Sequence, residues 1–309
     1  MTTAFIFPGQ GSQAVGMGKA LAASFEVAKQ VFEEADEALG ESLSGLCFEG
    51  PLDALTLTAN TQPAILTCSV AALAVLRAET DLTPTVCLGH SLGEYSALVA
   101  AGALSLPDAV RIVRRRGEAM QAAVAEGLGG MAAVIGLDPD VVQAVCDEAA
   151  QGEVCSPAND NGGGQIVIAG HAAAVARAVA LVKSRKGRAI PLKVSAPFHC
   201  ALMEPAATAL AEVLEPIEVG PLSVPVVSNV EATPNRDPSR VKTLLVQQVT
   251  QRVRWEASVQ HVVQAMGVRS AIEVGHGKVL AGLLRRIDRE IGVRGVGSPE
   301  DISVLKGPR

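Results

Sequence analysis

The stretch TVCLGHSLGEYSALVAAG, residues 85–102, decides the fold. Its first four residues are apolar and β-prone, and the part after residue 93 has the composition of a helix that ends in glycine. Gly89 and Gly93 flank Ser91, as a sharp strand-to-helix turn requires. The helix start points free N–H groups and its positive dipole end at the serine oxygen. The stretch therefore predicts an exposed nucleophile with an anion site beside it.

The bulk properties describe a chain that folds as a whole. It has 309 residues, 49% of them hydrophobic, and a formal net charge of -6. A chain of this length holds one large domain or two smaller ones. The net negative charge argues against general binding of nucleic acid or anionic membrane, and residues 114–116 (RRR) are the only tight basic run.

Several features indicate a soluble, cytoplasmic protein. The first eight residues lack a basic n-region and a long apolar region, so we expect no signal peptide. We expect no segment that is long and apolar enough to span a membrane, because the apolar run 70–76 is interrupted by Arg77 and Glu79. The cysteines lack metal-like or C-x-x-C spacing, which favours reduced, mostly buried thiols: Cys47, Cys68, Cys87, Cys146, Cys155 and Cys200.

Strands and helices alternate, which predicts an α/β protein with a mainly parallel sheet. Before the serine turn we expect a strand at 4–7, a loop at 8–13 and helices at 17–39 and 63–79, and after it a helix at 108–126.

The middle of the chain has another rhythm. Its expected order is β-α-β-β-α-β, the split pattern of a ferredoxin-like unit, and we place this small subdomain at 128–195. The larger catalytic domain would then comprise 1–127 and 196–309. Within the insert we expect strands at 131–136, 154–157, 165–169 and 188–194, with helices at 138–150 and 172–185.

After the insert the larger α/β rhythm resumes. The tail after Ile291 carries no clear signal. The expected elements are helices at 200–214, 238–250, 255–266 and 277–289, with strands at 224–228 and 271–274.

A serine nucleophile needs a base, and histidine suits neutral pH. His199 follows the point where the insert returns to the larger domain, so it could overhang Ser91. From the residues alone, a histidine that caps a helix start is the alternative interpretation. His90 adjoins Ser91, but neighbouring side chains at a strand end point to opposite faces.

The run of arginines on the helix at 108–126 is ambiguous. Three consecutive helical positions cannot all face one way, so one of Arg114, Arg115 and Arg116 can point inward while the others stay solvated. Spacing does not say which one. A buried arginine is a natural receptor for a substrate carboxylate.

Six motifs, taken together, resemble one family. They occur in order over residues 4–289, and jointly they are specific: FPGQGSQ (7–13), QPA (62–64), GHSLGEYS (89–96), RG (116–117), PFH (197–199) and VGHGKVL (274–280). The chain is similar in these residues to the malonyl-CoA:acyl carrier protein transacylases.

The resemblance implies an α/β-hydrolase-like core with an inserted ferredoxin-like subdomain. It assigns Ser91 as nucleophile and His199 as general base and then acid, a Ser–His dyad. The remaining roles it implies are oxyanion donors at the backbone N–H groups of Gln10 and Leu92, malonyl carboxylate binding by Arg116, histidine orientation by the carbonyl of Gln248, and further pocket positions at Gln62, Asn159, Asn161, Phe198 and Asn229. The ring of Phe198 fits acyltransferases that exclude an α-methyl branch.

The resemblance also implies substrates and partners. The expected reaction moves a malonyl group from malonyl-CoA, a coenzyme A thioester, to phosphopantetheinylated acyl carrier protein, in fatty-acid or polyketide biosynthesis. We expect no cofactor, no metal, no nucleic acid and no membrane partner, and a monomer.

Two rival functions remain open. A serine hydrolase would normally carry its base near the C-terminus, after an acid, whereas over a hundred residues follow His199. A non-catalytic subunit that docks a carrier protein would have no need of Ser91, His199 and Arg116.

Overall fold

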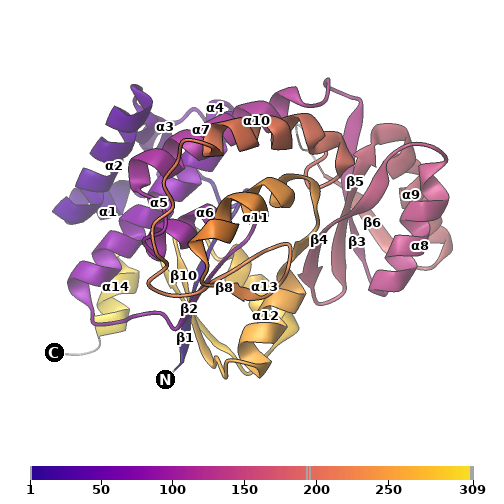
Figure 1. Ribbon diagram of the computed structural model, residues 1–309. Coiled ribbons are helices and arrows are strands. Elements are labelled where there is room, and N and C mark those ends of the chain that lie inside the picture. Colours follow the sequence, from indigo (N-terminus) through magenta and orange to yellow (C-terminus); the bar gives the residue numbers. More distant parts are fainter. Residues whose placement is uncertain (1, 193, 195, 307–309) are drawn as a thin grey trace.

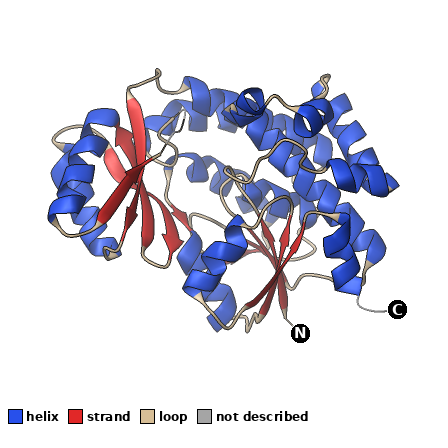
Figure 2. Cartoon of the chain, turned by 180° about the vertical axis from the view of Figure 1, so that it is seen from behind, coloured by secondary structure: helices blue, strands red, loops and turns tan. Residues whose placement is uncertain are grey.

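A computed structural model describes residues 2–192, 194 and 196–306. Within them the chain forms two separate β-sheets, each flanked by helices (Figure 2). The larger sheet has the order β11-β10-β1-β2-β7-β8, with every neighbouring pair parallel except β7 and β8. The predicted α/β class with a mainly parallel sheet is confirmed. Its strands are β1 (Thr3–Phe7), β2 (Val86–Gly89), β7 (Val226–Val227), β8 (Pro234–Asn235), β10 (Ser270–Val274) and β11 (Gly292–Val296).

Both faces of the larger sheet are covered, which explains why β1 is a continuous apolar run. Phe5 and Phe7 enter one core cluster, while Ala4 and Ile6 enter a second cluster with α12 and α13. The helices of this part are α1 (Lys19–Ser24), α2 (Glu26–Leu39), α3 (Leu43–Glu49), α4 (Leu52–Thr56), α5 (Thr58–Glu79), α6 (Gly93–Ala100), α7 (Leu106–Ala122), α10 (Glu204–Leu214), α11 (Pro238–Thr250), α12 (Trp255–Gln264), α13 (Val279–Ile287) and α14 (Pro299–Lys306).

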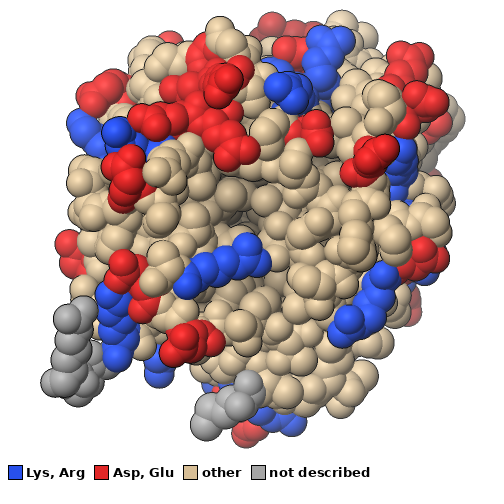
Figure 3. All heavy atoms as spheres, turned by 60° about the vertical axis from the view of Figure 1, so that its left-hand side comes forward, with Lys and Arg blue, Asp and Glu red and all other residues tan. Residues whose placement is uncertain are grey.

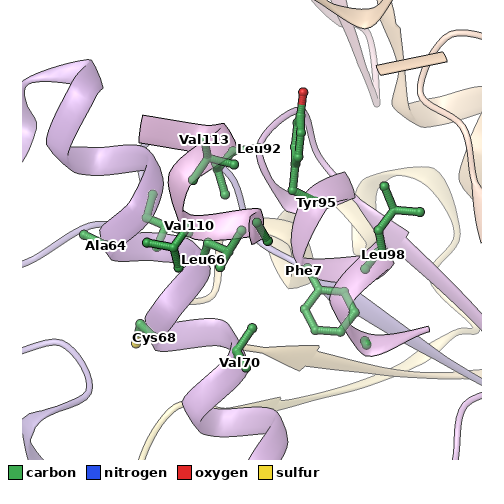
Figure 4. Packing of buried hydrophobic residues seen from close by; sticks show 14 of the residues in the cluster. Phe7, Ala64, Leu66, Cys68, Val70, Leu92, Tyr95, Leu98, Val110 and Val113 are labelled. Atoms are coloured by element: carbon green, nitrogen blue, oxygen red, sulfur yellow. The ribbon is translucent and has the colours of Figure 1, made fainter. Parts of the chain in front are cut away.

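The first core cluster fixes the helix that follows Ser91. Side chains of α5, α6 and α7 pack together over the Phe7 end of β1 (Figure 4). Apolar area removed from water stabilises such contacts by about 25 cal/mol per Å². The residues labelled in the figure are Phe7, Ala64, Leu66, Cys68, Val70, Leu92, Tyr95, Leu98, Val110 and Val113.

Helix α5 corrects one expectation. By length and composition it could cross a membrane, with a mean hydropathy of 1.4 over its most apolar window, so the expectation that no segment is long and apolar enough is wrong. However, 83% of that window is buried inside the protein, as in the core helix of a globular domain. The helix also begins at Thr58, and Pro63 lies inside it rather than at its start.

The smaller sheet has the order β6-β3-β5-β4-β9. Figure 1 labels four of its strands, β3, β4, β5 and β6, beside helices α8 and α9. Helices α8 and α9 cover one of its faces with a separate core. Along the chain the elements run β-α-β-β-α-β: β3 (Gly129–Ile135), α8 (Pro139–Ala150), β4 (Cys155–Gly162), β5 (Gln165–His171), α9 (Ala172–Ser184) and β6 (Arg188–Pro191). The fifth strand, β9 (Val253–Arg254), comes from the distant C-terminal part and pairs in parallel with β4. The domain limits at 128 and 195 stay a prediction, and residue 195 lies outside the described residues.

Several predicted boundaries were wrong. The tail after Ile291 contains β11 and α14, and helices α3 and α4 were not predicted. The helix expected at 17–39 is two helices, because the extended backbone of Phe25 interrupts it. The strand expected at 188–194 ends at Pro191, and residue 193 lies outside the described residues. The helix expected from residue 200 begins at Glu204, after a 3-10 turn at Ala201–Met203.

Charged side chains of both signs are mixed on one face of the molecule. On the face shown in Figure 3, Lys and Arg side chains lie among Asp and Glu side chains around a hollowed, uncharged area. The mixture of both signs on this face agrees with the modest formal net charge of the chain, -6.

Candidate active site

The turn between β2 and α6 holds Ser91 in a strained conformation. Its φ is 51°, in the left-handed region that a serine rarely adopts. The flanking glycines are required by close backbone contacts: a Cβ on Gly89 would lie 1.9 Å from the carbonyl carbon of Gly93, and one on Gly93 would lie 2.0 Å from the carbonyl oxygen of Phe7. The predicted strand–elbow–helix is present, and it brings Ser91 to the wall of a cavity of about 320 Å³.

The side chain of His199 meets the serine. Ser91 Oγ lies 2.8 Å from His199 Nε2, and His199 Nδ1 lies 2.8 Å from the carbonyl oxygen of Gln248. Because a carbonyl oxygen only accepts, Nδ1 carries the proton and Nε2 is free to accept one from Ser91. His199 also has a positive φ, 60°, so both partners of this contact occupy the left-handed region.

The histidine is kept neutral. Burial, and after it the nearby positive charge of Arg116, lower the pKa of His199 to about 3, although the hydrogen bond to Gln248 acts in the opposite direction. A neutral imidazole is ready to accept a proton from serine. Of the other histidines, His90 lines the same cavity, and its Nε2 lies 2.9 Å from Asn161 Oδ1. His171 precedes α9, His261 is on α12 and His276 is in the loop after β10.

Of the three consecutive arginines, Arg116 is the one that turns inward. It is 1% exposed, while Arg115 is exposed and pairs with Glu118, and Arg114 pairs with Glu41. Gly117 allows this arrangement, since a Cβ there would lie 2.7 Å from the carbonyl oxygen of Thr58 on α5. The close approach of α5 and α7 carries the guanidinium to the site.

The guanidinium of Arg116 donates to three oxygens. Nη1 donates to Gln62 Oε1 at 2.7 Å, and Nη2 donates to Gln248 Oε1 at 2.9 Å and to Ser91 Oγ at 3.1 Å. The cation therefore lies beside the nucleophile, and these hydrogen-bond partners are neutral. Such a site can bind a carboxylate carried on the group that reacts with Ser91.

Asn229 joins both sides of the elbow. Its Oδ1 accepts from the backbone N–H of Ser91 at 2.7 Å, and its Nδ2 donates to the carbonyl of Gly89 at 2.7 Å. Both atoms are thus used to hold the turn, so Asn229 supports the nucleophile from beneath and does not line the cavity.

The loop after β1 passes close over the elbow. A Cβ on Gly9 would lie 2.4 Å from the carbonyl oxygen of His90, and the Ser12 hydroxyl closes the loop by donating to the carbonyl of Gly9 at 2.9 Å. Gln10 and Leu92 both line the cavity, and no hydrogen bond from either backbone N–H occurs among the described residues. These two N–H groups can therefore donate to an anion.

The remaining predicted positions lie around the same cavity. Asn159 and Asn161 on β4, Gln62 on α5 and Phe198 beside the histidine all line it. Sequence reasoning missed several apolar wall residues, which carry no chemical signal of their own: Met120, Met131, Val167, Leu192 and Val194.

Sequence reasoning also missed Glu94. The motif quoted above contains it, but its burial was not foreseen: it is 3% exposed and bonds to both Gln248 and Asn229. No group of His, Cys, Asp and Glu side chains that could hold a metal occurs among the residues that the structure describes.

Comparison with known proteins places this geometry in a family. The model of the acyl transferase domain matches residues 4–295. The chain belongs to the acyl transferase family. Within that family it is 48% identical to the malonyl CoA-acyl carrier protein transacylase of Bacillus subtilis (strain 168), over 97% of this chain and 95% of that protein.

Solved structures of this acyl transferase family agree with the fold. An acyl-carrier-protein-S-malonyltransferase from Bartonella henselae is 51% identical, with a TM-score of 0.95 over 99% of this chain and 98% of that one. A second structure, described as a type II PKS acyl-carrier protein in complex with its malonyl-transacylase, is 44% identical, with a TM-score of 0.95 over 98% of both chains.

Proposed function

We propose that this chain transfers a malonyl group from malonyl-CoA to the phosphopantetheine thiol of an acyl carrier protein, through a malonyl ester on Ser91. One observation carries the proposal: Ser91 Oγ lies 2.8 Å from a neutral histidine nitrogen and 3.1 Å from the buried Arg116 guanidinium. A base and a carboxylate receptor thus flank the same nucleophile.

The first half-reaction acylates the serine. His199 Nε2 takes the proton of Ser91 as the oxygen attacks the thioester carbon of malonyl-CoA. The negative charge of the tetrahedral intermediate develops on the former carbonyl oxygen, and the backbone N–H groups of Gln10 and Leu92 donate to it. The C–S bond then breaks, and coenzyme A leaves with the proton held by His199.

The second half-reaction reverses these steps. The phosphopantetheine thiol gives its proton to His199 and attacks the malonyl ester, and Ser91 leaves with that proton. This is a ping-pong exchange between two thioesters, in which the site releases the first thiol before it binds the second. The solved complex of a malonyl-transacylase with an acyl-carrier protein supports a carrier protein as the acceptor.

Arg116 selects the acyl group. It lies close enough to Ser91 for the free carboxylate of a bound malonyl group to replace a neutral partner, which forms a charge-assisted hydrogen bond. An acetyl group offers no such partner and leaves the buried cation with neutral partners only. Malonyl is therefore favoured over acetyl by this side chain.

The compartment of the protein is indicated by its cysteines. All six cysteines are free and buried, which supports a reducing compartment such as the cytoplasm. We further propose that the protein works as a monomer, needs no cofactor beyond its two substrates, and serves fatty-acid or polyketide biosynthesis.

Intact mass spectrometry tests this function. After incubation with malonyl-CoA, the protein is expected to gain one malonyl group, and adding phosphopantetheinylated acyl carrier protein is expected to move that group to the carrier. The Ser91→Ala variant is the control and should gain nothing. Free malonate without malonyl-carrier product would instead identify a hydrolase, and an unmodified wild-type protein would identify a non-catalytic docking subunit.

A further inference from the structure

Glu94 is a buried acid outside the proposed reaction steps. It lies in the first turn of α6, and one of its carboxylate oxygens, Oε2, accepts two hydrogen bonds. The donors are Gln248 Nε2 at 2.7 Å and the backbone N–H of Asn229 at 3.1 Å. Its two partners are the residues that connect the histidine, the arginine and the elbow.

The bond to Glu94 decides which way the amide of Gln248 faces. Gln248 Nε2 donates to Glu94 at 2.7 Å and to the carbonyl oxygen of Ser91 at 3.0 Å. The carbonyl oxygen of Ser91 only accepts, and Glu94 Oε2 acts as an acceptor because it also takes the backbone N–H of Asn229, so the amide must present its NH₂ end to both oxygens. Its oxygen then faces Arg116 Nη2 at 2.9 Å. Rotation of the amide by half a turn would point N–H at the guanidinium instead.

Glu94 and Arg116 therefore lie at opposite ends of one amide group. Among the described residues no hydrogen bond or ion pair joins them directly. Burial raises the pKa of Glu94 to about 7, while the hydrogen bonds from Gln248 and Asn229 and the charge of Arg116 act in the opposite direction. The amide dipole is aligned between the two side chains, and the substrate side of the cation stays open.

We propose that Glu94 is a positioning residue for malonyl selectivity: by fixing the amide of Gln248, it holds the guanidinium of Arg116 beside Ser91 without pairing with it. A direct ion pair would occupy the cation and compete with the malonyl carboxylate. The inference rests on the proposed malonyl transfer, and it assigns to Glu94 an effect on which acyl group reacts.

Matched substitutions separate positioning from packing. Glu94→Gln keeps an oxygen that can accept both bonds, whereas Glu94→Leu has similar size and no acceptor. Glu94→Asp keeps the carboxylate, but its side chain is shorter by one methylene group and so moves the oxygens away from Gln248 and Asn229. Ser96→Ala is the control, because Ser96 is fully buried on the same helix and its hydroxyl has no hydrogen-bond partner among the described residues.

The measurement is the ratio of kcat/KM for malonyl-CoA to that for acetyl-CoA in Ser91 acylation. Loss of a hydrogen bond to a charged group predicts a fall in this ratio of about 10- to 100-fold in Glu94→Leu and Glu94→Asp. Glu94→Gln is expected to stay within about threefold of wild type, and Ser96→Ala to match it, because both keep the bonds that set the amide.

A double-mutant cycle tests the route of the effect. Gln248→Ala keeps the backbone carbonyl that accepts from His199 but removes the amide. If Glu94 acts through that amide, the double variant Glu94→Leu/Gln248→Ala will be no less selective than Gln248→Ala alone. Additive losses would overturn the proposal.

The outcomes distinguish this proposal from the proposed function. A wild-type enzyme that transfers no malonyl group would contradict the function itself. Normal malonyl transfer with an unchanged malonyl-to-acetyl ratio in Glu94→Asp and Glu94→Leu would overturn only the positioning role. If Glu94→Leu does not fold, the Glu94→Asp and Glu94→Gln pair decides, and an equal loss in Glu94→Gln would also overturn it.

Discussion

The two sheets contribute to the site in different ways. The part built on the larger sheet supplies Ser91 on its elbow, Arg116 on α7 and Gln248 on α11, and these are joined by hydrogen bonds. The smaller sheet supplies wall residues such as Asn159 and Val167. The comparison teaches that the reacting groups all come from the part built on the larger sheet, whereas the smaller sheet contributes only to the cavity wall, which it shares with residues such as Gln62 and Met120. Substitutions in the smaller sheet should therefore change the shape of the acyl pocket without removing a reacting group.

The largest expected effect concerns the elbow of the larger sheet. Ser91→Ala removes the atom that forms the ester, and transfer to carrier protein should fall by about 10⁴-fold or more. The variant should remain folded, since alanine removes only the hydroxyl oxygen and keeps the rest of the side chain. A radiolabelled malonyl transfer assay, with circular dichroism as the folding control, measures this. Residual transfer near the wild-type rate would place the nucleophile elsewhere.

Next in size is the loss of the carboxylate receptor. Arg116→Ala should lower the malonyl-to-acetyl ratio of kcat/KM by about 10²- to 10³-fold, because a desolvated charge-assisted bond is lost. Arg115→Ala, an exposed position on the same helix, is the matched control and should leave the ratio unchanged. Competition between the two thioesters for Ser91 measures it. Equal ratios in both variants would show that another group binds the carboxylate.

A smaller effect concerns pH. A base with a lowered pKa stays unprotonated to lower pH, and the pKa of His199 is lowered from 6.5 to about 3 by burial and Arg116. Single-turnover acylation of Ser91 should therefore change little from pH 7 to pH 5, where an ordinary histidine would lose about 25-fold. In Arg116→Ala the acid limb should move up toward 6.5. A wild-type limb already near 6.5 would contradict the assignment.

Glu94 titrates in the same range without altering that expectation. Burial raises its pKa to about 7, so it gains a proton as the pH falls. The protonated acid keeps an oxygen for its two bonds, as the Glu94→Gln variant does. Comparing the pH profiles of wild type and Glu94→Gln checks this point.

The smallest expected effect lies in the smaller sheet. Val167 lines the cavity, so Val167→Ala enlarges the cavity. Acylation by methylmalonyl-CoA should rise about tenfold relative to malonyl-CoA, since one methyl group changes binding in a pocket by about 1 to 3 kcal/mol. Its neighbour Ile168 points to the opposite, helix-covered face, so Ile168→Val should cost stability and leave selectivity unchanged. If Val167→Ala slowed malonyl transfer as strongly as Arg116→Ala, the division between the sheets would be wrong.

Local sequence predicted the elements whose cause is local. The elbow depends on glycines at 89 and 93, and the β-α-β-β-α-β order depends on alternating apolar segments. Strand β11 has the sequence GVRGV, in which two glycines and an arginine remove any apolar period, and only its pairing with β10 makes it a strand. The two-residue strand β9 is likewise a strand only because it pairs with β4.

Site residues that belong to sequence motifs were predictable. Site residues whose role depends on which side chain becomes buried were not. The sequence alone does not choose among Arg114, Arg115 and Arg116, because the choice depends on how closely Gly117 approaches α5. Glu94 resembles an ordinary acid in the first turn of a helix, where the dipole favours it at the surface. Its burial depends on Asn229 and Gln248, more than 130 residues further along the chain.

Strand β9 has a consequence for exchanging acyl pockets between related enzymes. Val253 pairs with Asn159, so the edge of the smaller sheet is completed by a segment that follows β6 by some sixty residues. If only the segment from β3 to β6 were transferred to a related enzyme, its four strands would have to pair with the β9 of the recipient instead of their own β9. A chimaera that keeps the donor's pocket would have to carry both pieces of chain.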